Sequence, residues 1–311
     1  MTYDLIIIGA GPAGLTAGIY ARSRKMKTLI IDAASAGGQL TNLYPEKAIH
    51  NYPGYVLIQA KKLGEKLRAQ AESMGCEIIE HERVLEIEDG DQSFLVHSQR
   101  GEHSSKSVIV AIGMGLFKPR RMNCLGEDEL CGRGVHYILP PKEYLVGKKV
   151  VMLGGGNSAL EMALIAESVT DTTVVHRRGA FRADESVVEA VCQSSIRQVL
   201  NSEVKSIDGG EKVVSVTVTS NGVEETIPAD MVIINIGITS DMEDLRNWNL
   251  ELDEDNLIKV DHCMTTSRPG IFACGDVVNY KGKYRQIVTA CGEAATACNS
   301  AYKFVKKPYW A

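Results

Sequence analysis

Two glycine-rich turns constrain the fold of this chain more than any other feature of its sequence. The first turn, GAGPAG at residues 9–14, follows an apolar run at 4–8 and precedes a helical pattern that extends to about Arg24. A second apolar run at 28–31 then ends on Asp32. Together these segments predict a βαβ dinucleotide-binding unit, which consists of a strand, a glycine turn, a helix and a second strand that ends on an acid.

The same order of elements starts again in the middle of the chain. An apolar run at 149–153 leads into GGGNSA at 154–159, a helical pattern that ends near Ser168, and a strand at 172–175. One such turn is a weak signal, whereas two turns with complete flanks are a strong one. The sequence therefore predicts an α/β protein with two Rossmann-like, three-layer ββα dinucleotide-binding domains.

Each copy continues into strand-forming segments with hairpin signals, such as Asp89-Gly90 in the first and Asn221-Gly222 in the second. Each copy then closes on a similar apolar strand, VIVAIG at 108–113 and VIINIG at 232–237. We place the joints between the two domains near residues 114–121 and 239–244.

The residues that end the second strand of each copy differ, and they predict different nucleotides. In both copies, glycines let the backbone approach a pyrophosphate at the positive end of the following helix. Asp32 can accept hydrogen bonds from a ribose diol but would repel a 2′-phosphate. The second copy instead has His176-Arg177-Arg178 and Arg182, whose guanidiniums suit the 2′-phosphate of NADPH. The alternative is a solvated basic turn.

A segment near the C-terminus favours FAD over NAD at the first site. TTSRPGIFACGD at 265–276 resembles a late flavin fingerprint, in which a strand delivers Asp276 to the ribityl chain. The alternative is an ordinary strand followed by a turn aspartate. Beyond it, Arg285-Gln286 and a helix from about Gly292 would direct a helix N-terminus at the flavin and stabilise negative charge on the reduced ring. The alternative there is an amphipathic helix without a ligand.

FAD contacts from both ends of the chain predict a discontinuous domain. We assign residues 1–115 and 245–311 to the FAD-binding domain and the inserted residues 116–244 to the NADP-binding domain. The predicted FAD contacts are Gly9, Gly11, Pro12, Ala13, Gly14, Asp32, Gly38, Gln39, Leu40, Tyr44, Gly113, Gly275, Asp276, Arg285, Gln286 and Ile287. The predicted NADP contacts are Gly154, Gly156, Asn157, Ser158, Ala159, His176, Arg177, Arg178 and Arg182.

Over essentially its whole length the chain resembles the low-molecular-weight thioredoxin reductase family. In that family GVHY, here at 134–137, leads into a redox-active CxxC pair, but residues 138–141 are ILPP. A disulfide relay needs two sulfurs close enough to bond, so thioredoxin reduction is disfavoured. The chain is more similar to the thioredoxin-reductase-like branch of ferredoxin/flavodoxin–NADP+ reductases, which lacks the pair. GGQLTNLYPEK at 37–47, FKPRR at 117–121 and His136-Tyr137 carry this resemblance.

The resemblance implies that Tyr44 stacks on the isoalloxazine ring and that the protein is a homodimer. The alternative for Tyr44 is a half-buried packing residue. Members of that branch usually continue beyond the last helix and cover the other flavin face with an aromatic residue. Tyr309 or Trp310 could serve here, although surface aromatics at a frayed terminus are the simpler interpretation.

Charge and cysteine content limit the remaining functions. The net charge of −5 argues against non-specific nucleic-acid binding. The most apolar stretch, 5–20, is too short to span a membrane and follows no basic region, which predicts a cytoplasmic protein. The seven histidines form no HxxxH or HxH pair, so no metal site is expected. Of the eight cysteines, we interpret the pairs seven residues apart as buried structural thiols: Cys124 with Cys131, and Cys291 with Cys298.

A basic cluster at Lys118, Arg120 and Arg121 stands out on a chain that is acidic overall. Ferredoxins and flavodoxins are acidic, so such a patch would steer their docking. The alternative is a solvated interdomain loop.

These features together predict an FAD-dependent NADPH oxidoreductase. Hydride would pass between NADPH C4 and flavin N5, and electrons would then pass singly to or from ferredoxin or flavodoxin. Because positioning and cofactor electronics carry this chemistry, no general acid or base is required. Two alternatives stay open: a disulfide reductase that uses an unconventional thiol such as Cys124, and a non-enzymatic redox sensor that binds FAD and NADP(H).

Overall fold

The structure, a computed structural model, describes residues 2–308, without the side chains of Phe117 and Ser240. Within this span the chain forms two compact units, and the second is an insertion in the first. The first unit comprises Met1–Phe117 with Ser240–Ala311, and the second comprises Lys118–Thr239.

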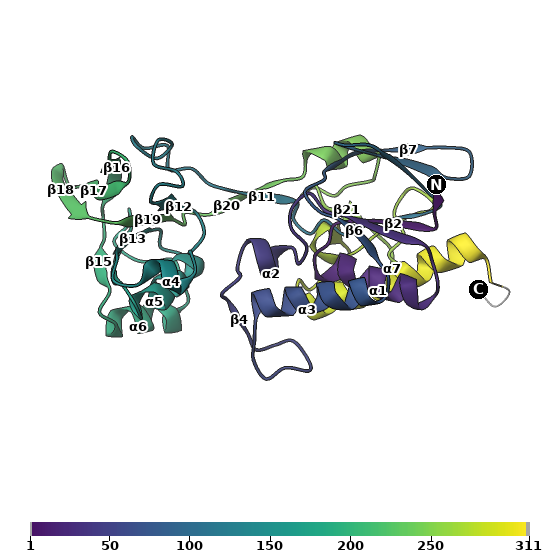
Figure 1. Ribbon diagram of the computed structural model, residues 1–311, viewed down its shortest axis with the longest axis horizontal. Coiled ribbons are helices and arrows are strands. Elements are labelled where there is room, and N and C mark those ends of the chain that lie inside the picture. The colour runs from purple at the N-terminus through teal and green to yellow at the C-terminus, as the bar shows by residue number, and fades with distance from the viewer. Residues whose placement is uncertain (1, 309–311) are drawn as a thin grey trace. The chain divides into compact units, whose positions relative to one another are not determined.

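The chain passes between the two units twice. It does so through β11 (Leu116–Pro119) and β20 (Ile238–Asp241), which pair with each other as a two-stranded sheet (Figure 1). Gly115 allows this close approach, because a Cβ there would lie 2.2 Å from the carbonyl oxygen of Asp241.

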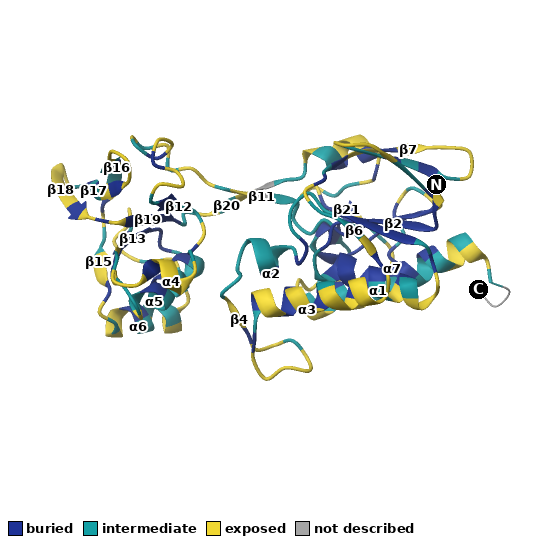
Figure 2. Cartoon of the chain, viewed as in Figure 1, coloured by how far each residue is buried: buried dark blue, intermediate teal, exposed yellow. Residues whose placement is uncertain are grey.

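A five-stranded parallel sheet with the order β22-β10-β2-β3-β6 forms the centre of the first unit. Four of these strands are buried along their whole length, as expected for a parallel sheet that is covered on both faces. Figure 2 shows β2 in dark blue. The strands are β2 (Leu5–Ile8), β3 (Thr28–Ile31), β6 (Glu77–Ile79), β10 (Val108–Val110) and β22 (Ile271–Ala273).

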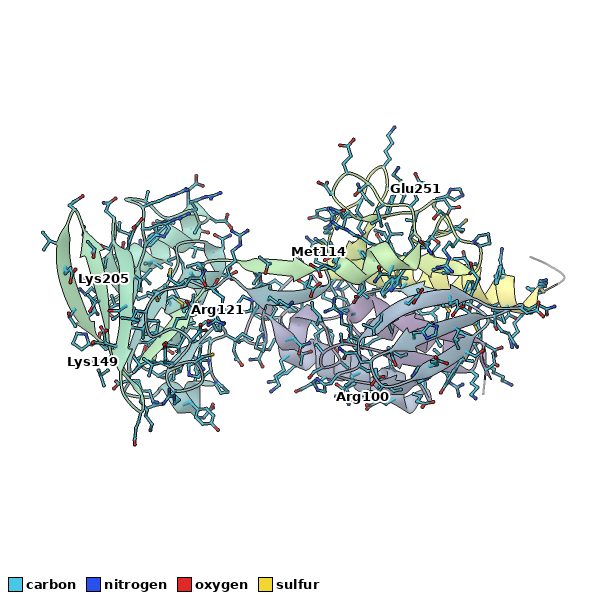
Figure 3. All side chains as sticks on the ribbon, turned by 90° about the horizontal axis from the view of Figure 1, so that it is seen from above. Arg100, Met114, Arg121, Lys149, Lys205 and Glu251 are labelled. Carbon is cyan, nitrogen blue, oxygen red and sulfur yellow. The ribbon has the colours of Figure 1, made fainter. Side chains whose placement is uncertain are left out.

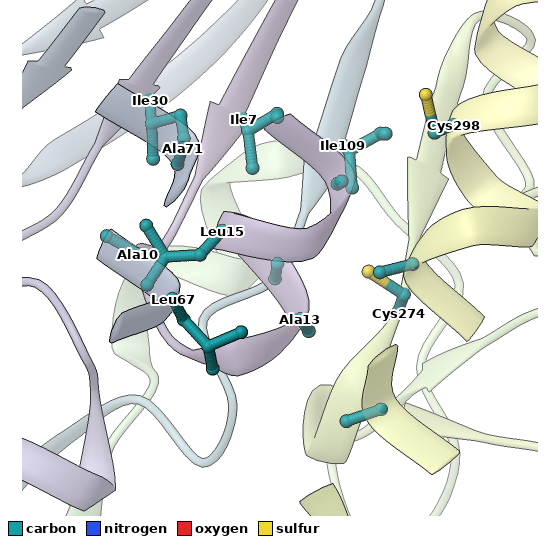
Figure 4. Packing of buried hydrophobic residues seen from close by; sticks show 14 of the residues in the cluster. Ile7, Ala10, Ala13, Leu15, Ile30, Leu67, Ala71, Ile109, Cys274 and Cys298 are labelled. Atoms are coloured by element: carbon teal, nitrogen blue, oxygen red, sulfur yellow. The ribbon is translucent and has the colours of Figure 1, made fainter. Parts of the chain in front are cut away.

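Alternating side chains of this sheet pack against two different layers. Ile7, Ile30 and Ile109 pack on one face in a cluster with residues of the helices (Figure 4). Ile6 and Val108 pack on the other face, against a 3-10 helix, η1, and a mixed sheet of order β1-β9-β8-β7. In this sheet β1 runs parallel to β9, and the other pairs are antiparallel. The covering elements are α1 (Pro12–Ser23), α3 (Ala60–Ser73), α7 (Ile287–Lys306), β1 (Thr2–Tyr3), β7 (Val84–Asp89), β8 (Phe94–Ser98), β9 (Glu102–Ser105) and η1 (Glu243–Trp248).

The second unit repeats the same three layers. Its parallel sheet has the order β12-β19-β13-β14-β15. Met152 and Val174 pack on the helical face, whereas Val151 and Val175 pack against an antiparallel sheet of order β16-β17-β18. The elements are β12 (Val135–His136), α4 (Lys142–Leu145), β13 (Lys149–Leu153), α5 (Asn157–Glu167), β14 (Asp171–Val175), α6 (Glu185–Gln193), β15 (Arg197–Val199), β16 (Glu203–Gly209), β17 (Val213–Ser220), β18 (Val223–Pro228) and β19 (Met231–Ile234).

The predicted fold class is therefore confirmed, since both copies form a three-layer ββα dinucleotide-binding unit. Short elements complete the first unit. They are α2 (Gln39–Asn42), β4 (Ala48–Ile49), β5 (Ile58–Gln59), β21 (Ile258–Lys259), η2 (Gly275–Val277) and β23 (Val278–Asn279). None of the helices among residues 2–308 combines the length and the apolar character needed to cross a membrane.

The last helix begins earlier than predicted. We expected it from about Gly292, but α7 begins at Ile287 because Gln286 caps it. The side chain of Gln286 accepts a hydrogen bond from the backbone of Thr289, and Thr289 Oγ1 accepts one from the Gln286 N–H at 3.1 Å. This reciprocal capping box satisfies two backbone donors that a helix terminus otherwise leaves free.

Candidate functional site

The first glycine turn leaves open space at one of its residues. Gly9 and Gly14 are required by packing: a Cβ on Gly9 would lie 2.4 Å from the Ala111 carbonyl oxygen, and one on Gly14 would lie 1.8 Å from that of Gly9. Gly11 differs, since a Cβ there would meet only the Cα of Gly38, at 3.9 Å. Because α1 starts at Pro12 without a side-chain cap, this space lies at a helix N-terminus that suits a pyrophosphate.

Asp32 ties the end of β3 to this turn. Its carboxylate accepts hydrogen bonds from the backbone N–H groups of Ala10 and Ala34, the latter at 2.7 Å. Burial raises the pKa of Asp32, and the two backbone hydrogen bonds oppose that rise. The structure thus places the predicted ribose acceptor beside the predicted pyrophosphate turn.

Three segments that are far apart in the sequence meet near Asp276. Gln39, the first residue of α2, forms a side-chain hydrogen bond with the Asp276 carboxylate. A Cβ on Gly113 would lie 3.9 Å from Gln39 Nε2. Burial raises the pKa of Asp276, whereas the positive charges of Lys283 and Arg285 oppose the rise. The predicted FAD contacts from both ends of the chain therefore converge.

The remaining predicted flavin contacts lie around α2 and the start of α7. Tyr44 follows α2 and is half-buried, with Lys47 Nζ 5.9 Å from its ring centroid. Gln286 caps α7 and accepts a 2.9 Å hydrogen bond from Asn51 Nδ2, and Ile287 is the first residue of the helix. Tyr309 and Trp310, the candidates for covering the second flavin face, lie outside the described residues.

The second glycine turn is fixed by its neighbours in a similar way. A Cβ on Gly154 would lie 2.2 Å from the Asn235 carbonyl oxygen, and one on Gly155 would lie 2.4 Å from Nδ1 of His176. The backbone of Arg182 bridges to the turn, because its N–H donates to the Gly155 carbonyl oxygen at 2.7 Å. This contact places the arginine-containing segment beside the predicted pyrophosphate turn.

A cavity of about 1380 Å³ in the second unit combines these residues. It is lined by the turn at 154–159 and by His176, Arg177, Arg178 and Arg182. Nε2 of His176 is buried without a hydrogen-bond partner in the described part of the chain. Burial lowers the pKa of His176, and two adjacent arginines lower it further. The three guanidiniums that line this cavity fit an anionic group such as a 2′-phosphate.

The predicted contact Asn157 has a second role in this structure. Its side-chain amide donates to Asp184 Oδ2 at 2.8 Å, and its carbonyl oxygen accepts from the Asp184 N–H at 2.7 Å. The side chain thereby links the start of α5 to the start of α6, so a nucleotide would meet the backbone N–H groups at this helix N-terminus. Ser158 and Ala159 line the cavity beside it.

One residue of the predicted basic cluster, Arg121, is paired with acidic side chains. Arg121 forms ion pairs with Glu127, at 3.0 Å, and with Asp128, so acids balance its charge. Glu127, which the sequence did not single out, also accepts a 2.6 Å hydrogen bond from the Tyr137 hydroxyl. Lys118 and Arg120 are exposed and line the cavity of the second unit. Figure 3 labels Arg121 on this unit.

The cysteines are all free, but not all of them are buried as predicted. Cys298 is buried, Cys124 and Cys291 are half-buried, and Cys131 is exposed. The prediction for Cys131 was therefore wrong, because this residue lies in a turn, where its N–H bonds to the Asp128 carbonyl oxygen at 3.3 Å. Burial raises the pKa of Cys124 to about 11, with a contribution from Glu127. Among residues 2–308, no group of three His, Cys, Asp or Glu side chains could hold a metal.

Sequence comparison identifies the class of protein that this fold and these two sites define. Residues 3–294 match the family described as pyridine nucleotide-disulphide oxidoreductase, and the chain belongs to that family. It is an oxidoreductase that uses FAD and NADPH, and the two turns, the acid at one and the arginines at the other, fit these cofactors.

Individual relatives and solved structures show which proteins this chain is similar to. The chain is 39% identical over 310 residues to ferredoxin–NADP reductase 2 of Shouchella clausii, covering 97% of this chain and 93% of that protein. It is 38% identical to ferredoxin–NADP reductase of Enterococcus faecalis, covering 98% and 92%. Among solved structures, thioredoxin reductase of Lactococcus lactis is 33% identical with a TM-score of 0.79, covering 98% of this chain and 100% of that chain.

Proposed function

We propose that this protein exchanges electrons between NADP(H) and ferredoxin or flavodoxin. When bound, FAD supplies N5 as the acceptor for hydride from NADPH C4 and exchanges electrons singly with the carrier. The observation that carries this proposal is the pairing of two complete dinucleotide sites with ILPP at 138–141, where thioredoxin reductases have their disulfide. Relatives named ferredoxin–NADP reductase support the same carrier.

The residues of the chain bind and orient in this scheme, and none needs to move a proton. We assign FAD to the first unit, with the pyrophosphate at Gly11, a ribose at Asp32 and the ribityl chain at Asp276. Tyr44 would stack on the isoalloxazine ring and exclude water from it. We assign NADP(H) to the second unit, with the pyrophosphate at the turn 154–159 and the 2′-phosphate at the three arginines.

For the carrier we propose docking at Lys118 and Arg120. Arg120 supports this, because it is exposed and its guanidinium has no ion-pair partner in the described part of the chain. An acidic carrier would be steered there by long-range attraction that salt screens. Arg121 is left out of this patch because Glu127 and Asp128 balance its charge.

We also propose that the protein is a homodimer, which the family resemblance supports, and that it is cytoplasmic. Light scattering of the purified holoenzyme tests the dimer, and a mass of one chain would contradict it. Cell fractionation tests the location, and recovery with the membrane fraction would contradict that.

One experiment tests the function. NADPH oxidation is measured side by side with ferredoxin, flavodoxin and thioredoxin as acceptors, with ferricyanide as a general acceptor. We expect turnover with ferredoxin or flavodoxin and none with thioredoxin. Turnover with thioredoxin that is lost in Cys124→Ser would instead show a disulfide reductase. Flavin that binds but is not bleached by NADPH would show a sensor.

A further inference from the structure

A buried ion pair lies beneath the predicted ribityl-binding turn. The side chains of Lys283 and Glu293 are only 2% and 6% exposed, and Lys283 Nζ is 2.6 and 2.7 Å from the two carboxylate oxygens. Lys283 comes from the loop before α7, and Glu293 lies on α7 itself. Burying two charges is costly, and such a pair often adds little net stability. The burial of this pair therefore indicates a role other than stabilising the fold.

Both charged groups bind the same residue of the backbone. Lys283 Nζ donates to the Gly275 carbonyl oxygen at 2.9 Å, and the Gly275 N–H donates to Glu293 Oε2 at 2.8 Å. Gly275 is buried and has φ +82°, a conformation that only glycine adopts easily. The backbone of Gly275 is thus bound by the positive Lys283 at its carbonyl oxygen and by the negative Glu293 at its N–H.

A third side chain completes this cluster. The Tyr280 hydroxyl donates to Glu293 Oε1 at 2.7 Å, and Lys283 Nζ lies 5.6 Å from the centre of its ring. Burial and the neighbouring Glu293 raise the pKa of Tyr280 to about 12, so it keeps its proton at neutral pH. Each carboxylate oxygen of Glu293 therefore has at least two hydrogen-bond donors.

Gly275 connects two parts of the predicted flavin site. Asp276 is its neighbour in the chain and receives the hydrogen bond from Gln39. On the other side, a Cβ on Gly275 would lie 3.2 Å from the Cβ of Ala13, at the N-terminus of α1. Any movement of Gly275 would shift Asp276 and change its approach to the pyrophosphate turn.

We propose that Lys283, Glu293 and Tyr280 form a positioning cluster that fixes Gly275 and thereby presents Asp276 to FAD. The cluster rests on the proposed function, because it requires FAD in the first unit. Its three residues are positioning residues, since they act through the backbone of Gly275. They preorganise the site and so lower the ordering cost that FAD binding would otherwise carry.

The test compares Glu293→Gln with a matched control, Asp4→Asn. Asp4 also belongs to a charged network of the first unit, with Lys106 at 3.0 Å and Lys306 at 2.9 Å, but it precedes β2, at the end of that strand away from the glycine turn. For each variant, the melting temperature of the apoprotein and the Kd for FAD are measured, the latter by flavin fluorescence. We expect Glu293→Gln to raise the Kd about tenfold or more, and Asp4→Asn to change it less than about twofold.

A double-mutant cycle with Asp276→Asn separates positioning from simple destabilisation. If the cluster acts through Asp276, Glu293→Gln raises the Kd far less in the Asp276→Asn background than in the wild type. The visible circular dichroism of bound flavin at saturating FAD should also differ between Glu293→Gln and the wild type. Additive effects on the Kd, or an unchanged spectrum, would overturn the proposal.

A milder variant covers the case in which Glu293→Gln does not fold. Tyr280→Phe keeps both charges and removes one hydrogen bond, and we expect it to raise the FAD Kd about threefold. An unchanged Kd in a folded Tyr280→Phe protein would overturn the proposal. Failure of the proposed function looks different, because the wild-type protein would then bind FAD but would not turn over with ferredoxin or flavodoxin.

Discussion

Replacing Arg177 and Arg178 together with alanine tests the nucleotide assignment most directly. Both side chains are exposed, line the cavity of the second unit and form no ion pair within residues 2–308. No acid therefore competes for them, and their charges are available to a 2′-phosphate. NADH lacks that phosphate, so it serves as an internal comparison.

The exposure of the two arginines determines how much NADPH binding free energy the double variant should lose. A hydrogen bond to a charged group contributes about 1.5–3 kcal/mol when it is protected from water. Solvent screening reduces this at exposed positions, to roughly 0.5–1 kcal/mol for each arginine. The double variant should therefore lose about 1–2 kcal/mol of NADPH binding, which corresponds to a rise in KM of about 5–30-fold. The KM for NADH should change less than about twofold, because the glycine turn is unaltered.

The assay is steady-state oxidation of NADPH and NADH with ferricyanide as acceptor, which bypasses the protein carrier. Arg197→Ala is the matched control, since Arg197 is an exposed arginine of the same unit that pairs with Glu225 and does not line the cavity. It should leave both KM values unchanged. Equal increases for NADPH and NADH in the double variant would refute the phosphate assignment.

Three further predictions follow from other residues. Arg120→Ala should raise the ferredoxin KM several-fold at low ionic strength and little at high salt, whereas a higher NADPH KM would place this residue with the nucleotide. Cys124→Ser should keep full NADPH:ferredoxin activity, because its thiol has a pKa of about 11 and is protonated at neutral pH, and a loss of activity would contradict this. Burial raises the pKa of Asp4, but hydrogen bonds from Lys306 and Lys106 outweigh it and hold the pKa at about 2, below its ordinary 3.8. The stabilisation by Asp4 is therefore present above pH 4 and is lost as the pH falls toward 2. The unfolding free energy of the wild type should therefore fall by about 2 kcal/mol more than that of Asp4→Asn over this range, and parallel curves would contradict the assignment.

The parts of the fold that local sequence determines were predictable. The strands at 28–31 and 149–153 are continuous apolar runs of the kind that fill a parallel sheet, and the structure has β3 and β13 there. Gly9 and Gly154 mark turns in which a side chain would collide with a neighbouring carbonyl. Such signals lie within a few residues of the element they define, so the sequence shows them directly.

Features that depend on contacts between distant segments were not predictable. The Lys283–Glu293 pair joins a loop to a helix, and nothing in the spacing of these residues shows that both are buried. The charge on Arg121 is balanced by acids that come from the following turn, which a count of basic residues does not reveal. The start of α7 was missed because Gln286 is an uncommon N-cap, and its partner Thr289 supports it only once the chain is folded.

The pairing of β11 with β20 has a consequence for engineering this chain. Thr239 Oγ1 donates to the Lys118 carbonyl oxygen at 3.1 Å, so the two ends of the second unit lie next to each other. A segment whose two ends are adjacent can be removed, or replaced by another segment, without changing the path of the rest of the chain. Because we assign NADP(H) to this unit, we expect that exchanging residues 118–239, one continuous stretch of the gene, changes the coenzyme preference.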